Sequence, residues 1–250
     1  MEKIMTTPDT NKNKRPVALV TGAGSGIGKA CALLLASEGY DIALVARTRK
    51  TLEATAAACS ELDAACQTLV LPADICETDM PDAIINDITD QWGRLDVLMN
   101  IAGSAPLLPI DQITPQNWRS CVDSNLSGAV LLTAAAWPIF KRQKSGFVGN
   151  VSSMASIDPF PGFAMYAAAK TGLNMFTHCT AQEGQAINVR AVAVAPGAVE
   201  TPMLRLNFGE KIIGKDKTLP PDAIAQLLCD CLMKLRVFES GETILLTSPV

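Results

Sequence analysis

From Pro16 onward, short apolar runs alternate with longer segments of mixed apolar and polar residues. The short runs are apolar at nearly every position, which is typical of strands covered on both faces in a parallel sheet. Alternation of such strands with helices predicts a doubly wound α/β fold. Seven runs are predicted to be strands: VALVTG, DIALVAR, TLVLPAD, DVLMNIAG, GFVGNVSS, VRAVAVAPG and TILLTS.

Ala, Leu and Met recur at helical spacing between these runs. Thr114 followed by Pro115 predicts a helix start, because Thr can cap the first turn and Pro fits the first helical position. Pro221 before Asp222 suggests another start. Six helices are expected, at 26–38, 49–60, 78–92, 115–142, 163–184 and 221–235.

The length of 250 residues would allow two average domains. No linker, internal repeat or low-complexity segment follows residue 15, so we expect a single domain over 16–250. Residues 1–15 are polar except for Ile4 and Met5, and we expect them to form a flexible leader.

The net charge, the hydropathy and the cysteines argue against a nucleic-acid-binding, membrane or secreted protein. The formal charge of -4 is dispersed along the chain, whereas a nucleic-acid surface needs clustered cations. No apolar run reaches the roughly 18 residues of a membrane span, and no signal-peptide pattern is present. The eight cysteines lack a CxxC pair and are expected to be buried, reduced thiols. We therefore expect a cytoplasmic protein with a small-molecule substrate and with neither a nucleic-acid nor a membrane partner.

A glycine-rich turn joins the first predicted strand to the first predicted helix. It comprises Gly22, Ser25, Gly26, Ile27 and Gly28. Glycines allow a backbone to approach a pyrophosphate closely, and the free N–H groups of the following helix attract its charge. The order of strand, glycines and helix predicts a dinucleotide site.

Tyr166 and Lys170 are spaced to lie one turn apart on one face of a helix. A neighbouring cation favours the phenolate, so we expect a lowered Tyr166 pKa that permits proton exchange near neutral pH. This spacing alone often means only a half-buried Tyr beside a solvated Lys. Ser153, thirteen residues before Tyr166 at the end of a predicted strand, favours the catalytic interpretation.

Taken together, these motifs resemble the short-chain dehydrogenase/reductase family from about Pro16 to Leu246. Thr21, Gly22, Gly26 and Gly28 match its TGxxxGxG turn, and 100–103 resembles its NNAG segment, with Ile101 as a departure. Residues 195–202 resemble its PGxVxT segment. The resemblance implies a Rossmann-type fold and an NAD(P)(H)-dependent oxidoreductase that interconverts a carbonyl and a secondary alcohol, with 3-oxoacyl reductase-like chemistry as one form. It also implies a catalytic set of Asn125, Ser153, Tyr166 and Lys170.

The choice of cofactor is argued from the end of the second strand, where NAD-binding relatives place an Asp. This chain has Ala46 there, followed by Arg47 and Thr48, which suit a 2′-phosphate. We expect NADP(H) rather than NAD(H); the alternative is that Arg47 is a solvated loop charge. The expected cofactor-binding residues are Gly22, Ser25, Gly26, Ile27, Gly28, Arg47, Thr48, Asp74, Ile75, Asn100, Ala102, Gly103, Tyr166, Lys170, Pro196, Gly197, Val199 and Thr201.

The substrate pocket is expected to be largely apolar, and no metal is expected. Its predicted lining residues are Ser153, Met154, Phe160, Phe163 and Met203. The stretch from Thr201 to Pro221 is shorter than is usual in the family, and the family's DGG ending is absent, so the substrate itself is not predicted.

Three other functions fit these motifs less well than an oxidoreductase. A methyltransferase would share the glycine turn but would not need Ser153, Tyr166 and Lys170 in register. A serine hydrolase would need a GxSxG elbow, which is absent. A non-catalytic nucleotide-binding regulatory protein on the same fold stays as the alternative. The small residues of 115–142 and 163–184, together with the family resemblance, predict a homo-oligomer, either a dimer or a tetramer.

Overall fold

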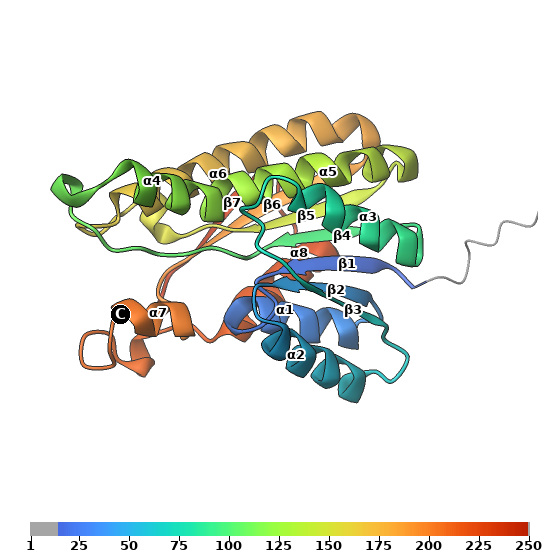
Figure 1. The fold of residues 1–250 in the computed structure, drawn as a ribbon, viewed down its shortest axis with the longest axis horizontal. Coiled ribbons are helices and arrows are strands. Elements are labelled where there is room, and N and C mark those ends of the chain that lie inside the picture. The colour runs from blue at the N-terminus through green and yellow to red at the C-terminus, as the bar shows by residue number, and fades with distance from the viewer. Residues whose placement is uncertain (1–14, 250) are drawn as a thin grey trace, which may run out of the picture.

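The computed structural model describes residues 15–249, which build one parallel sheet of seven strands in the order β3-β2-β1-β4-β5-β6-β7. The predicted doubly wound fold is confirmed (Figure 1). The strands are β1 Val17–Thr21, β2 Asp41–Ala46, β3 Thr68–Pro72, β4 Val97–Asn100, β5 Gly146–Val151, β6 Val189–Pro196 and β7 Thr243–Leu246. The helices are α1 Gly26–Ser37, α2 Arg49–Leu62, α3 Met80–Trp92, α4 Pro115–Val122, α5 Gly128–Gln143, α6 Ala164–Gly184, α7 Pro202–Asn207 and α8 Pro221–Leu232.

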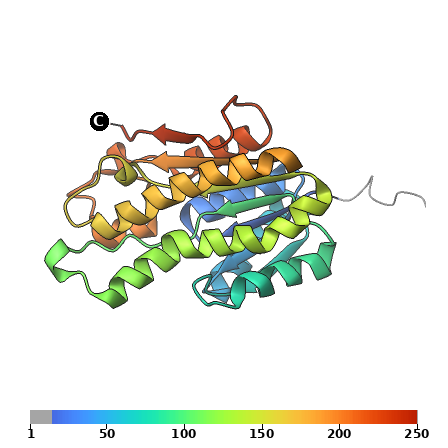
Figure 2. The same cartoon turned by 90° about the horizontal axis from the view of Figure 1, so that it is seen from above.

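Two apolar cores lie on opposite faces of the sheet, because successive strand side chains point to opposite sides. Ala18 and Val20 of β1 pack with α1, α2 and α8 on one face. Val17 and Leu19 of the same strand pack with α3, α5 and α6 on the other. Seen from above, α5 and α6 run side by side across the sheet (Figure 2).

The expected single helix over 115–142 is wrong in one respect. A five-residue π-helical turn, Asp123–Ser127, separates α4 from α5. Within it the Asn125 side chain donates to the carbonyl of Cys121 at 2.9 Å, a bond that competes with the regular helical ladder. The predicted start is right, since Thr114 and Asn117 form a capping box.

The other expected helices begin and end within two residues of their predicted bounds, except the last one, and one short helix was not predicted. The last helix ends at Leu232 instead of 235, because the chain turns at Lys234, whose φ is +62°. The short helix α7 was not predicted; it begins where the Thr201 hydroxyl accepts a hydrogen bond from the Leu204 amide.

The leader proposed for residues 1–15 falls outside the described residues except for Arg15. Its guanidinium pairs with Asp41 at 3.1 Å and with Asp63 at 2.6 Å, which ties residue 15 to the sheet. Within 15–249, no helix combines the length and apolarity that a bilayer crossing needs.

All eight cysteines are free thiols, and six are buried as expected. The prediction is wrong for Cys76 and Cys179, which are exposed.

Candidate active site

The glycine turn, the carboxyl ends of the central strands and the loops that follow them line a cavity of about 970 Å³. In an open parallel sheet this edge is where ligands bind. The cavity brings together all the predicted site residues except Asn100. Asn100 is buried behind the wall, where its amide donates to Asn150 at 2.9 Å and holds β4 to β5.

The glycine turn fits a pyrophosphate. Gly22 and Gly26 have φ of +68° and +51°, which side chains rarely adopt, and a Cβ on Gly28 would overlap the Gly22 carbonyl. Ser25 precedes α1 without capping it, so the first amides of the helix are free to bind an anion. Thr21 fixes the neighbouring loop by accepting hydrogen bonds from the amides of Ile101 and Ala102, at 2.9 and 3.0 Å.

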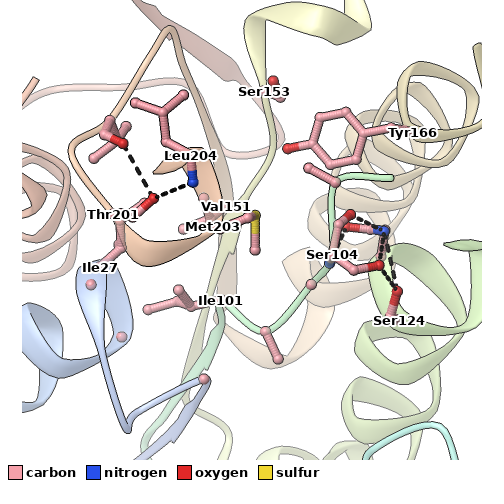
Figure 3. Close-up of a pocket in the computed structure, with 18 of the residues that line it drawn as sticks. Ile27, Ile101, Ser104, Ser124, Val151, Ser153, Tyr166, Thr201, Met203 and Leu204 are labelled. Carbon is pink, nitrogen blue, oxygen red and sulfur yellow. Dashed lines mark hydrogen bonds between the residues drawn. The ribbon is translucent and has the colours of Figure 1, made fainter. Parts of the chain in front are cut away.

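Ser153 and Tyr166 share one side of the cavity, facing Ile27 and Thr201 across it (Figure 3). Ser153 lies two residues after the end of β5 and accepts a hydrogen bond from the Ala155 amide at 3.1 Å, which leaves its own proton free to donate. Tyr166 comes from the first turn of α6.

Lys170 lies one turn beyond Tyr166 and is buried. Its Nζ donates to the Val151 carbonyl at 2.8 Å and lies 5.8 Å from the centre of the Tyr166 ring. The predicted one-turn spacing therefore does place the ammonium beside the phenol.

Asn125 reaches the same site from the π-helical turn. Its amide donates to the Ser104 carbonyl at 2.7 Å, and its Oδ1 accepts from the Ser104 amide at 3.3 Å. A Cβ on Gly103 would lie 2.6 Å from Asn125 Oδ1 and 3.6 Å from Lys170 Nζ. Because Gly103 has no side chain, a small space remains between Asn125 Oδ1 and Lys170 Nζ.

Burial is the largest cause of the pKa shifts of Lys170 and Tyr166. It lowers the pKa of Lys170 to about 8, since the ammonium is removed from water. Burial also raises the pKa of Tyr166, and the Ser153 hydroxyl opposes this shift. The expected lowering of the Tyr166 pKa is therefore wrong for the structure, because desolvation of the phenolate outweighs the favourable neighbours.

Ala46, Arg47 and Thr48 line the far end of the cavity beyond β2. Arg47 and Thr48 are exposed. Within residues 15–249, no carboxylate lies at ion-pairing distance from Arg47. Asp74 borders the same region and accepts a hydrogen bond from the Cys76 amide at 3.0 Å.

Aromatic rings gather beside Tyr166 at the other end. The Phe163 ring is 5.4 Å from that of Tyr166, and Phe208 lies 6.1 Å from Phe163 and 6.4 Å from Phe160. Phe163 is buried and Phe160 is 59% exposed. Met154 and Met203 also line the cavity, as predicted.

Sequence reasoning missed several lining residues: Asn207, Phe208, Lys217 and Ser248. Asn207, Phe208 and Ser248 make contacts with residues distant along the chain, which the local sequence pattern does not reveal. Asn207, for example, donates to the Ala105 carbonyl at 2.6 Å. The missing DGG ending was the one signal that pointed toward Ser248.

The model of the short chain dehydrogenase family matches residues 16–211. The chain belongs to this family. It is 36% identical over 197 residues to a 3-oxoacyl-[acyl-carrier-protein] reductase of Synechocystis sp., with 79% of each chain covered. It is 34% identical over 200 residues to levodione reductase of Leifsonia aquatica, covering 80% of this chain and 75% of the relative.

Solved structures agree with this assignment. The crystal structure of levodione reductase superposes with a TM-score of 0.86 at 29% identity, covering 93% of this chain and 96% of the other. Acetoin dehydrogenase of Salmonella typhimurium superposes with a TM-score of 0.83 at 27% identity, covering 93% and 94%. The chain is therefore an oxidoreductase of the short-chain dehydrogenase family, acting on a carbonyl/alcohol pair with a nicotinamide nucleotide.

Proposed function

We propose that this short-chain dehydrogenase reduces a ketone on a largely apolar substrate with NADPH, using Asn125, Ser153, Tyr166 and Lys170. The observation that carries the proposal is the placement of Ser153 and Tyr166 on one side of the cavity, with the Lys170 ammonium beside the ring. Two hydroxyl donors there can both reach one substrate oxygen.

Each residue has a distinct task in the reduction. When bound, the nicotinamide supplies the hydride that the carbonyl carbon accepts. Tyr166 gives its proton to the carbonyl oxygen, which completes the alcohol, and the Ser153 hydroxyl stabilises the charge that develops on that oxygen. Lys170 stabilises the phenolate that remains, and Asn125 holds a water that links Lys170 to solvent. Oxidation runs through the same groups in reverse.

The cofactor would extend from the glycine turn toward Tyr166. The free amides of α1 suit the pyrophosphate, with Ile27 beside them, and the nicotinamide end suits Ala102, Gly103 and the segment from Pro196 to Thr201. Asp74 and Ile75 suit the adenine. The expected role of Asn100 changes from cofactor contact to support of β4, since its side chain is bonded within the core.

Preference for NADP(H) is supported by Arg47 and Thr48, an exposed guanidinium and hydroxyl at the cavity edge with no acidic residue at position 46. A 2′-phosphate would pair with that guanidinium. The preference for a reduction is supported by two relatives whose names describe reductases of a 3-oxoacyl group and of levodione.

Initial rates with NADPH and NADH on a panel of uncharged ketones test the proposal. We expect a higher kcat/KM with NADPH, and Ala46→Asp should favour NADH because a carboxylate repels the 2′-phosphate. Equal use of both cofactors by the native protein would remove the NADP(H) assignment. Tight NADPH binding without turnover of any ketone would favour a regulatory nucleotide-binding role.

We also propose that copies of this chain assemble through the outward face of α4, α5 and α6. Exposed apolar side chains on these helices include Trp118, Leu131 and Met175. Of the small residues expected to pack helices closely, Ala134 and Ala168 are exposed on this face, whereas Ala136 and Ala167 are buried within the subunit.

The eight free thiols suit a reducing compartment, which supports the cytoplasm as the location of the protein.

A further inference from the structure

The segment that follows β7 packs directly against the loop that joins β6 to α7. The amide of Gly197 in this loop donates to the Leu246 carbonyl at 2.9 Å, continuing the pairing of β6 with β7. One residue later the partner is a side chain, because the Ala198 amide donates to Ser248 Oγ at 2.6 Å. The same hydroxyl lies 3.4 Å from the Ala198 carbonyl oxygen.

The loop and Ser248 are in close contact, which requires glycine at position 197. A Cβ on Gly197 would overlap Ser248 Oγ and lie 2.9 Å from the Ser248 amide nitrogen. Pro249 follows Ser248 and disfavours helical backbone at Ser248. Ser248 is half-buried and lines the cavity, whereas Thr247 before it is exposed.

The far side of the loop is held by backbone bonds to Leu219 and by a side-chain bond in which Thr218 Oγ1 donates to Glu200 at 3.3 Å. The Leu219 amide donates to the Ala198 carbonyl at 2.8 Å, and the Glu200 amide donates to the Leu219 carbonyl at 2.9 Å. The Ser248 hydroxyl and the Leu219 backbone amide thus clamp Ala198 from two sides.

We propose that Ser248 is a positioning residue that sets the depth of the loop from Pro196 to Thr201, and through it the binding of the nicotinamide half of the cofactor. The inference rests on the proposed function, in which this loop contacts the nicotinamide. Ser248 does not need to touch the cofactor for this role. Its loss releases the Ala198 amide and lets the loop move outward, while the glycine turn and Arg47 keep their places.

The first test measures, in the protein without cofactor, how strongly Ser248 protects the Ala198 amide from hydrogen exchange. In Ser248→Ala, exchange of the Ala198 amide hydrogen, followed by NMR, should be about fivefold faster or more, because its hydrogen-bond acceptor is gone. Ser248→Thr keeps the hydroxyl and should restore slow exchange. Thr247→Ala is the matched control and should leave exchange unchanged. Unchanged exchange in Ser248→Ala would overturn the inference.

The second test separates the two halves of the cofactor. Ser248→Ala should weaken binding of NADP⁺ by about three- to tenfold, the range expected for one hydrogen bond. Binding of adenosine 2′,5′-bisphosphate, which lacks the nicotinamide, should stay as in the wild type. Equal weakening of both ligands would indicate a general loss of structure and would overturn the inference.

The outcomes also distinguish this inference from the proposed function. A wild-type protein that binds neither NADP⁺ nor NAD⁺ overturns both. A wild-type protein that binds NADP⁺ while Ser248→Ala binds it equally well overturns the role of Ser248 alone.

Discussion

Tyr166 and Lys170 show how burial sets the chemistry of individual residues in this site. Their spacing in the sequence predicts that they are neighbours, and they are. Their pKa values depend on how much water the fold removes, and that depends on the loops above them. Burial shifts the pKa of both groups toward the neutral form, raising that of Tyr166 and lowering that of Lys170.

The pH dependence of the two reaction directions follows from Tyr166. Because its pKa is raised, the phenol stays protonated through neutral pH and can supply a proton for reduction. We expect kcat/KM for ketone reduction to hold through neutral pH and fall at alkaline pH, and that for alcohol oxidation to rise with pH. Tyr166→Phe should lower both by about 10²- to 10⁴-fold. Initial rates from pH 5 to 10 test this; reduction that is faster at pH 9 than at pH 6 would contradict it.

Lys170 is predicted to destabilise the fold at neutral pH. Its pKa of about 8 lies below the usual lysine value of 10.5, so the folded state disfavours the charged form. The penalty, about 3 kcal/mol, is present below pH 8 and disappears as the pH rises through 10.5. Replacing Lys170 with Met removes the penalty but also loses the bond to Val151, worth about 1 kcal/mol.

Lys170→Met should therefore gain about 2 kcal/mol of unfolding free energy at pH 7 and lose that gain above pH 10.5. Urea unfolding at both pH values measures this, with the exposed Lys141→Met as control. A variant less stable than the wild type at pH 7 would contradict the argument. Its activity should be lost at every pH, since Lys170 acts in the reaction.

Among the secondary-structure elements, the π-helical turn is one that the apolar periodicity of the sequence does not predict. The apolar spacing of 115–142 continues without a break, so it predicts one helix. The interruption comes from Asn125, whose side chain bonds to Ser104 in a loop twenty-one residues earlier. Only the folded chain brings that loop alongside. The same interruption sets Asn125 close to Lys170 on the neighbouring α6.

Gly103→Ala tests whether the space between Asn125 and Lys170 matters. The new methyl would lie 2.6 Å from Asn125 Oδ1, so the side chain of Asn125 must shift. We expect kcat to fall at least about tenfold, with a loss of about 1–3 kcal/mol of unfolding free energy from overpacking. Gly209→Ala is the matched control, because a Cβ there meets nothing within 4 Å. Similar behaviour of the two variants would contradict the prediction.

Elements that can be predicted from the sequence depend on residues close together along the chain. Elements that cannot be predicted depend on contacts between residues far apart along it. The glycine turn, the one-turn spacing of Tyr166 and Lys170 and the run of strands are local patterns, so they could be predicted. The segment from Glu200 to Thr218 could not, because it is held by contacts without a period. Arg205 pairs with Glu200 and donates to the carbonyls of Phe208 and Ile213, and that arrangement carries Phe208 to the aromatic cluster beside Tyr166.

For the whole molecule, the parallel sheet explains why residues from distant parts of the chain share one site. Every strand ends at the same edge, so the segments that follow all seven strands border one cavity. Leu131 and Met175, which are exposed on α5 and α6, are not among the residues that line this cavity. The assembly proposed through these side chains therefore does not use the cavity lining.

The last prediction concerns that assembly. Leu131 and Met175 project from α5 and α6, are 42% and 63% exposed, and lie on helices that run side by side (Figure 2). A stable interface covers about 800 Å² on each partner and places apolar side chains at its centre. We expect the native protein to be a dimer or tetramer by light scattering at micromolar concentration.

Leu131→Glu combined with Met175→Glu should give the mass of a single chain, because two carboxylates would be buried without partners at the interface. The control is Leu62→Glu, which places one new carboxylate on α2, a helix of the opposite face, where Leu62 is 56% exposed. This control should keep the native mass. A native protein with the mass of one chain, or an equal loss of assembly in Leu62→Glu, would show that the α4 to α6 face is not the interface.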